Sequence, residues 1–179
     1  RHRIPKSTNE KGETYKALED LTQGDVYLKS KRKDERNLIA EAKDDGYQLA
    51  FNRTMMDKAD GDKLLGLFAY SGMDDGIAYT NSKNSAERTQ PSLKEMTDKA
   101  LSILSKDKNG FFLMVEGGQI DWAGHSNDAG TMLHEMIKFD EAVQSVYDWA
   151  QGRDDTLIIV TADHETGSFG FSYSSKDLP

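Results

Sequence analysis

The sequence FFLMVEGGQIDWAGH, residues 111–125, joins a continuous apolar run to a cluster of residue types that bind metals. Residues 156–164, TLIIVTADH, repeat this arrangement. A short apolar run bounded by glycine or polar residues is typical of a strand that is buried on both faces, as in parallel sheets. We therefore predict buried strands at 111–115 and 157–160.

Helical patterns and weaker strand signals surround these two runs. We expect helices at four places: residues 35–44, 55–59, 92–105 and 131–150. Ser92 and Glu95 have the spacing of a capping box, which marks the start of the third helix. Shorter strands are expected at 47–51 and 64–70, and an irregular loop at 71–90, which is rich in Gly, Asp, Asn and Ser. Strands that alternate with helices predict an α/β fold with three layers, α/β/α, and a mostly parallel sheet.

The composition excludes several classes of function. The 179 residues include 31 acidic and 23 basic side chains, for a net charge of −8. Non-specific nucleic-acid binding needs clustered Lys and Arg, so we expect no nucleic-acid partner. The sequence has no run of 18 apolar residues, so no membrane span is expected. It also has no cysteine, which excludes disulfides and thiolate metal sites without fixing the compartment.

Acidic and histidine residues follow both predicted buried strands. Asp121 and His125 are four residues apart, which on a helical turn places both side chains on one face, able to bind one cation. Asp163 and His164 are adjacent, and a loop can turn both toward one metal. Because ligands gather at the carboxyl ends of strands in open α/β sheets, parallel strands would bring the two pairs to one edge. The Asp and His mixture suits zinc, whereas Glu116 suits the harder magnesium ion.

Each of these signals also has a plainer interpretation. An isolated Asp-x-x-x-His pair is more often a surface coincidence, and only the repetition after two strands favours a metal site. Trp122 could be core packing, but its place within the first cluster puts it close to any bound substrate. His2 and His134 lack comparable support and are interpreted as structural or solvated. Ser126 is interpreted as a helix-end capping residue and not as a nucleophile.

At these residues the chain resembles the alkaline phosphatase family, of the bacterial type. Residues 110–167, with FFLMVEGGQIDWAGH, the FDEAV segment and TLIIVTADH, look like the central signature region of that family. The stretches KLLGLFAYSGMDD and PSLKEMTDKALSILS are also similar to it. The resemblance covers most of residues 36–170, with several motifs in the order and spacing of the family.

The resemblance implies a mechanism and a set of ligands. Family members hydrolyse phosphate monoesters in two steps through a phosphoserine, with two zinc ions and one magnesium ion. By resemblance, Glu116 binds magnesium, and Asp121 and His125 bind the zinc ion that activates water in the second step. Asp163 and His164 bind the zinc ion that activates the serine. The resemblance further implies a periplasmic or secreted protein, and a homodimer of the full-length parent.

Several parts of the family's site are not found in the sequence. The Asp-Ser-Ala-type nucleophile motif, the Asp shared by zinc and magnesium, the Thr of the magnesium site and the phosphate-binding Arg are missing. A third zinc ligand, a His, would follow Pro179. Trp122 stands where some members have a Lys or His beside the substrate phosphate. Five candidate ligands cannot fill three sites that need about four to six each. We therefore expect residues 1–179 to form a single incomplete α/β domain of a larger phosphatase, inactive alone.

Two other functions stay open. The parent could be another hydrolase of the same superfamily, such as a phosphodiesterase, a sulfatase or a phosphoglycerate mutase, although VEGGQIDWAGH favours a phosphomonoesterase. The chain could instead be a structural or binding module that a metal stabilises, with no chemistry. Such a module would form no phosphoenzyme.

Overall fold

The computed structural model describes residues 32–34 and 36–167. Within them the elements follow in the order α2 (Leu38–Asp44), β1 (Gln48–Ala50), α3 (Arg53–Lys58), β2 (Leu64–Gly66), α4 (Gly76–Ser82), α5 (Leu93–Leu104), α6 (Gln119–His125) and α7 (Ala129–Trp149). No helix in this part of the chain is both long and apolar enough to cross a bilayer. His2 lies outside the described residues.

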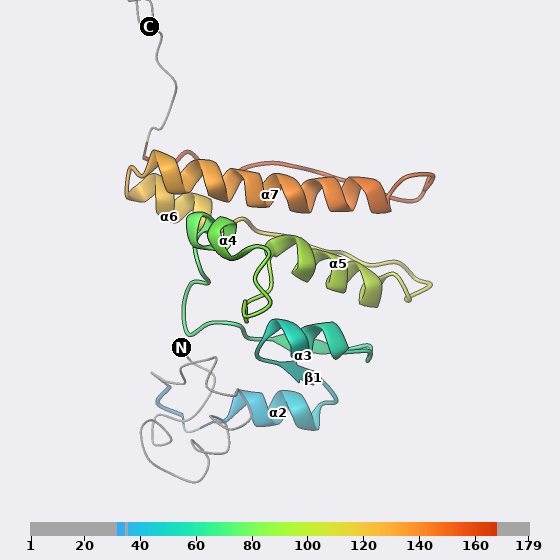
Figure 1. Cartoon of the computed structure of the whole chain (residues 1–179). Helices are drawn as coiled ribbons and strands as arrows, with labels where there is room; N and C mark the ends of the chain where they lie inside the picture. The colour runs from blue at the N-terminus through green and yellow to red at the C-terminus, as the bar shows by residue number, and fades with distance from the viewer. Residues whose placement is uncertain (1–31, 35, 168–179) are drawn as a thin grey trace, which may run out of the picture.

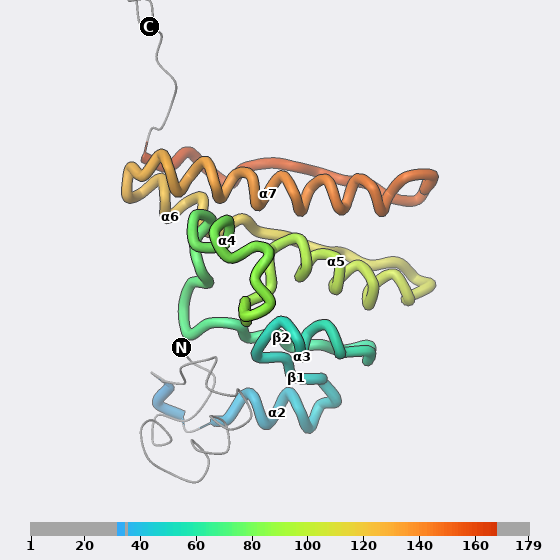
Figure 2. Tube along the Cα trace, viewed as in Figure 1, coloured from blue at the N-terminus to red at the C-terminus, as the bar shows by residue number. Residues whose placement is uncertain are grey.

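The elements are stacked from α7 at one end of the molecule to α2 at the other (Figure 1). The long helix α7 contacts α4, α5 and α6, while α2 and α3 both pack against β1. Figure 2 shows the small sheet beside α3, with α5 between it and α7. The site residues of α6 therefore lie at one end of α7, far from the sheet.

The sheet is parallel, as predicted, but it has only two strands within the described residues. β1 pairs with β2 in the register Gln48↔Leu64, Leu49↔Leu65 and Ala50↔Gly66. Ala50 is fully buried and packs with Met56 and Phe68, so the sheet and α3 share one small core. The α/β class with an incomplete, mostly parallel sheet is confirmed, and the predicted strands at 47–51 and 64–70 are shorter than expected.

The prediction of buried strands at 111–115 and 157–160 is wrong for the described part of the chain. Both segments are extended and run alongside the helices (Figure 1), but neither belongs to a sheet. Phe112 is 87% exposed and Leu157 is 84% exposed. A strand buried on both faces needs neighbouring strands and a second covering layer. Here α5 and α7 cover only one side, around a cavity of about 170 Å³.

A helix occurs where an irregular loop was expected. α4 lies within residues 71–90, and its N-cap is Asp75, whose carboxylate accepts a hydrogen bond from the Ala78 N–H at 2.9 Å. Gly76 lets the helix lie directly on α7, because a Cβ at this position would be 2.6 Å from the carbonyl carbon of His134. The amino-acid composition of residues 71–90 did not predict this helix, because its first turn is stabilised by the N-cap and by the contact with α7.

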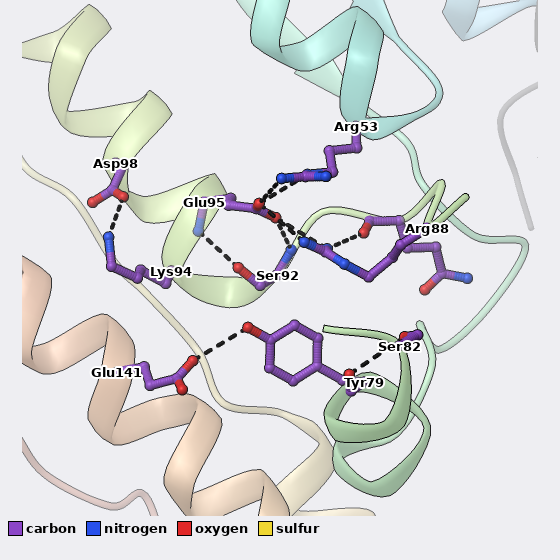
Figure 3. Close-up of polar contacts among 10 residues, drawn as sticks. Arg53, Tyr79, Ser82, Arg88, Ser92, Lys94, Glu95, Asp98 and Glu141 are labelled. Atoms are coloured by element: carbon purple, nitrogen blue, oxygen red, sulfur yellow. Dashed lines mark hydrogen bonds and ion pairs between the residues drawn. The ribbon is translucent and has the colours of Figure 1, made fainter. Parts of the chain in front are cut away.

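The predicted capping box at the start of α5 is confirmed, and it belongs to a larger ion-pair network (Figure 3). Glu95 Oε1 accepts hydrogen bonds from Arg53 Nε at 2.8 Å and Arg88 Nη2 at 3.0 Å, and Glu95 Oε2 accepts from the Ser92 N–H at 2.7 Å. Burial alone would raise the pKa of Glu95. Hydrogen bonds from Arg88 and Ser92, with the charges of Arg88 and Arg53, outweigh it and lower the pKa to about 2.

We expect Glu95→Gln to destabilise the protein at neutral pH. A pKa lowered from 4.5 to about 2 corresponds to roughly 3 kcal/mol of stability. We expect about 2 kcal/mol because the Glu95 side chain is 27% exposed and partly screened. This contribution is complete above pH 4.5 and is lost as the pH falls to about 2.

Urea unfolding of the parent and the Glu95→Gln variant, at pH 7 and at a series of acidic pH values, measures this difference. The two unfolding free energies should converge in acid. Glu87→Gln serves as the matched control, because Glu87 is an exposed glutamate in the same loop region. A Glu95→Gln variant as stable as the parent at pH 7 would show that the network contributes nothing.

Candidate metal centre

The helix α6 presents the first predicted ligand pair on its exposed side. α6 begins after Gly118, which has helical backbone angles and makes no side-chain cap. Ala123 and Gly124 are buried, while Asp121 and His125 are not. Asp121 Oδ1 lies 3.5 Å from His125 Nε2. The helical spacing of this pair is therefore as expected, and its role as a ligand pair stays a prediction.

The second predicted pair lies in the irregular segment that follows residues 157–160. The His164 N–H donates to Asp163 Oδ1 at 3.0 Å, and His164 Nε2 lies 3.3 Å from Asp163 Oδ2. The Asp163 side chain is 88% exposed. Both side chains are thus accessible to an ion from solvent and lie close together, and their role as a ligand pair stays a prediction.

One hydroxyl group connects the two pairs. Thr166 Oγ1 donates to Asp121 Oδ1 at 2.9 Å and lies 3.1 Å from His164 Nδ1. These contacts bring a residue of α6 next to a residue that is 43 positions later in the sequence. Sequence reasoning missed Thr166, although a hydroxyl residue two positions after His164 is a signal that could have been weighed.

Two glycines allow the segment 163–167 to lie directly on α6. Gly167 has a φ of +68°, and a Cβ there would be 2.3 Å from the Gly124 carbonyl oxygen. A Cβ on Gly124 would in turn be 3.0 Å from Thr166 Cγ2. Side chains at these positions would push the segment away from α6 and break the contact between Thr166 and Asp121.

The surroundings of His164 favour its charged form. The hydrogen bond to the Glu165 carbonyl raises the pKa of His164, and the nearby carboxylates of Asp163 and Asp121 raise it further, against a smaller effect of burial. The same negative charges that favour the protonated ring would attract a metal cation. Because an imidazole binds a metal only through a nitrogen without a proton, a proton and a metal compete for the His164 ring.

Glu116 lies apart from the two pairs, next to a larger cavity. It lines a cavity of about 440 Å³ together with Trp122, Met73 and Met96. The Trp122 ring closes over Gly72, where a Cβ would be 2.4 Å from Trp122 Cζ3. The indole therefore packs against Gly72 in the lining of this cavity, and its place beside a substrate stays a prediction.

The donor atoms suit zinc in kind but are too few in number. Carboxylate oxygens and imidazole nitrogens are ordinary zinc ligands, and a zinc site needs about four ligands, of which water can be one. Within residues 32–34 and 36–167, no three His, Asp or Glu side chains are grouped closely enough to hold an ion. Each pair fits as two ligands of a site whose remaining ligands come from elsewhere.

The other candidates of the sequence have structural contacts. His134 Nδ1 lies 3.0 Å from Thr80 Oγ1, which links α7 to α4. Ser126 is the C-cap of α6, and its backbone N–H donates to the Trp122 carbonyl at 3.1 Å. These contacts agree with the interpretation of both residues as structural.

Comparison with known proteins identifies the family. The family described as alkaline phosphatase matches residues 9–178. Alkaline phosphatase 3 of Bacillus subtilis is 46% identical over 138 residues, which cover 77% of this chain and 28% of that protein. The chain thus spans less than a third of this relative.

Solved structures give the same answer. The cold-active alkaline phosphatase of Shewanella sp. superposes with a TM-score of 0.64 at 36% identity, covering 88% of this chain and 39% of that one. A variant of the alkaline phosphatase of the Antarctic bacterium TAB5, described with Mg bound in its M3 site, superposes with a TM-score of 0.59 at 35% identity, covering 76% and 38%. The resemblance drawn from the motifs is confirmed: the chain belongs to the alkaline phosphatase family.

Proposed function

We propose that the protein containing these residues hydrolyses phosphate monoesters, and that this chain supplies part of a site for two zinc ions and one magnesium ion. The main support for the proposal is that Asp121 and His164 both contact the Thr166 hydroxyl and therefore lie close together. Two clusters that are distant in sequence share one place, as a metal-dependent site requires. Membership of the alkaline phosphatase family supports the reaction class.

Five side chains have proposed ligand roles. Asp121 and His125 would hold one zinc ion, Asp163 and His164 the other, and Glu116 the magnesium ion. When bound, such a pair of cations stabilises the charge on the attacking and leaving oxygens of an in-line displacement. The carboxylates supply the negative charge that retains the cations, and the imidazoles bind them in the neutral form.

The charge of the chain makes local cations necessary for this reaction. A net charge of −8 repels a phosphate ester, and bound divalent ions are the usual means of reversing the sign at a site. Trp122 would lie beside the substrate in place of a basic residue. We propose that phosphate is held there by the cations more than by side chains of α6.

Four further proposals rest on family membership and on the motifs. Residues 1–179 form a single incomplete α/β domain, and this chain alone forms no phosphoenzyme and has no phosphatase activity, because it contains no Asp-Ser-Ala motif. The whole protein acts in the periplasm or as a secreted protein, and it forms a homodimer.

A second candidate function is a metal-stabilised module without chemistry. The exposed ligand pairs, with no three-ligand group among residues 32–34 and 36–167, favour this alternative. It differs from the first in that the full-length protein would bind a cation and turn over no ester.

We expect zinc binding by the full-length protein to depend on both ligand pairs. Asp121→Asn and Asp163→Asn each remove one anionic ligand, and each should lower the zinc affinity by roughly 100-fold or more, since a zinc site needs about four ligands. Asp154→Asn changes an exposed aspartate at the other end of α7 and is the matched control. Calorimetric titration of metal-free protein measures the affinities, and equal affinities in all three variants would reject the proposed centre.

We expect the full-length protein to prefer phosphate monoesters. Its kcat/KM for an aryl phosphate should exceed that for the matching diester and sulfate ester by on the order of 100-fold, about 2.7 kcal/mol of transition-state stabilisation. Parallel assays with the three aryl esters measure this ratio. A faster diester or sulfate reaction would point to another hydrolase of the superfamily, and no turnover of any ester would point to the module without chemistry.

A further inference from the structure

We propose that Thr166 is a positioning residue of the metal centre. Its hydroxyl holds the His164 ring and the Asp121 carboxylate in one relative orientation, with Asp121 Oδ2 left free for one cation and His164 Nε2 facing Asp163 Oδ2, 3.3 Å away, for the other. This inference rests on the proposed function, because it concerns the same site. It assigns a role to a residue that is neither a predicted ligand nor in contact with the reacting atoms.

The hydrogen bonds around His164 determine which ring nitrogen carries the proton. Nδ1 lies 2.8 Å from the Glu165 carbonyl oxygen, and a carbonyl oxygen can only accept, so Nδ1 must be the donor. The same Nδ1–H points near Thr166 Oγ1, at 3.1 Å. In the neutral ring Nε2 then has no hydrogen and offers its lone pair, which is the form that binds a metal.

The Thr166 hydroxyl has one proton, and its direction follows from the same argument. Because Nδ1 of His164 is a donor, Oγ1 acts as acceptor toward it and directs its own proton to Asp121 Oδ1, 2.9 Å away. Asp121 Oδ2 takes part in no hydrogen bond or ion pair with any residue in 32–34 or 36–167. One carboxylate oxygen is thus bound and the other is free.

The methyl group of Thr166 explains why threonine suits this role. Cγ2 packs against Gly124. A rotation about χ1 would make the methyl group clash with α6 or lose its packing against Gly124, so the preferred rotamer is restricted. The β-branched side chain is therefore held with its hydroxyl facing Asp121. A serine would keep the hydroxyl but lose this restriction, and a valine would keep the shape but lose both hydrogen bonds.

The test compares Thr166→Val with Thr166→Ser in the full-length protein. Zinc titration of metal-free protein should show an affinity lower by about 10-fold to 100-fold for Thr166→Val, as for other residues that orient metal ligands, and recovery of most of it in Thr166→Ser. The visible absorption of the Co²⁺-substituted protein gives a second readout, since it reports ligand geometry independently of turnover. Its bands should shift in Thr166→Val. Thr161→Val is the matched control, because among the residues that the structure describes the Thr161 hydroxyl bonds only to the neighbouring Ala162 carbonyl.

Parent-like zinc affinity and cobalt spectrum in Thr166→Val, with binding lost in Asp121→Asn, would overturn the positioning role and leave the proposed function intact. Binding unaffected by Asp121→Asn would overturn both, because no ion would then lie at Asp121. If Thr166→Val loses helix content by circular dichroism, Thr166→Ala removes the hydroxyl with less steric change, and the same two results decide.

Discussion

The packing of three helices against α7 is the contact on which the rest of the described structure depends. α4, α5 and α6 all lie on this one helix, and its buried positions include Ala142 and Glu135. The Glu135 carboxylate is 3% exposed and is paired with Lys138 at 3.1 Å, so the charge within the interface is compensated. Because α6 is seated on α7, this packing fixes the place of Asp121, against which the segment that carries His164 lies through Thr166.

Carboxylates of this chain occur in two electrostatic situations that differ in how fully their charge is matched. Glu95 is surrounded by Arg53, Arg88 and a backbone N–H, and these donors and positive charges lower the pKa of its carboxyl group. Asp121 and Asp163, in contrast, have only a histidine and uncharged donors nearby within residues 32–34 and 36–167. The first arrangement stabilises the fold and has no capacity for another cation. The second leaves negative charge available, which is the arrangement that a metal centre needs.

Local patterns predicted what local interactions determine. The capping box of Ser92 and Glu95 and the helical spacing of Asp121 and His125 follow from short-range signals, and the structure confirms them. The parallel pairing of β1 with β2 is also confirmed, and it was predicted from the alternation of strands and helices. Other features depend on contacts between distant residues. α4 requires Gly76 to meet α7, and Thr166 gains its partners only because Gly124 and Gly167 let two segments touch. The segments 111–115 and 157–160 were predicted as strands from apolarity, but strand pairing needs neighbours that residues 32–34 and 36–167 do not provide.

Those two extended segments have a consequence for how such a chain behaves in solution. Phe112, Met114, Leu157 and Ile159 point away from the helices, and the backbone amides and carbonyls of both segments make no backbone hydrogen bond with any other described residue. Exposed apolar ribbons with unpaired backbone recruit further strands from any available chain. The same two features that suit the interior of a sheet thus favour self-association of this region through added strands.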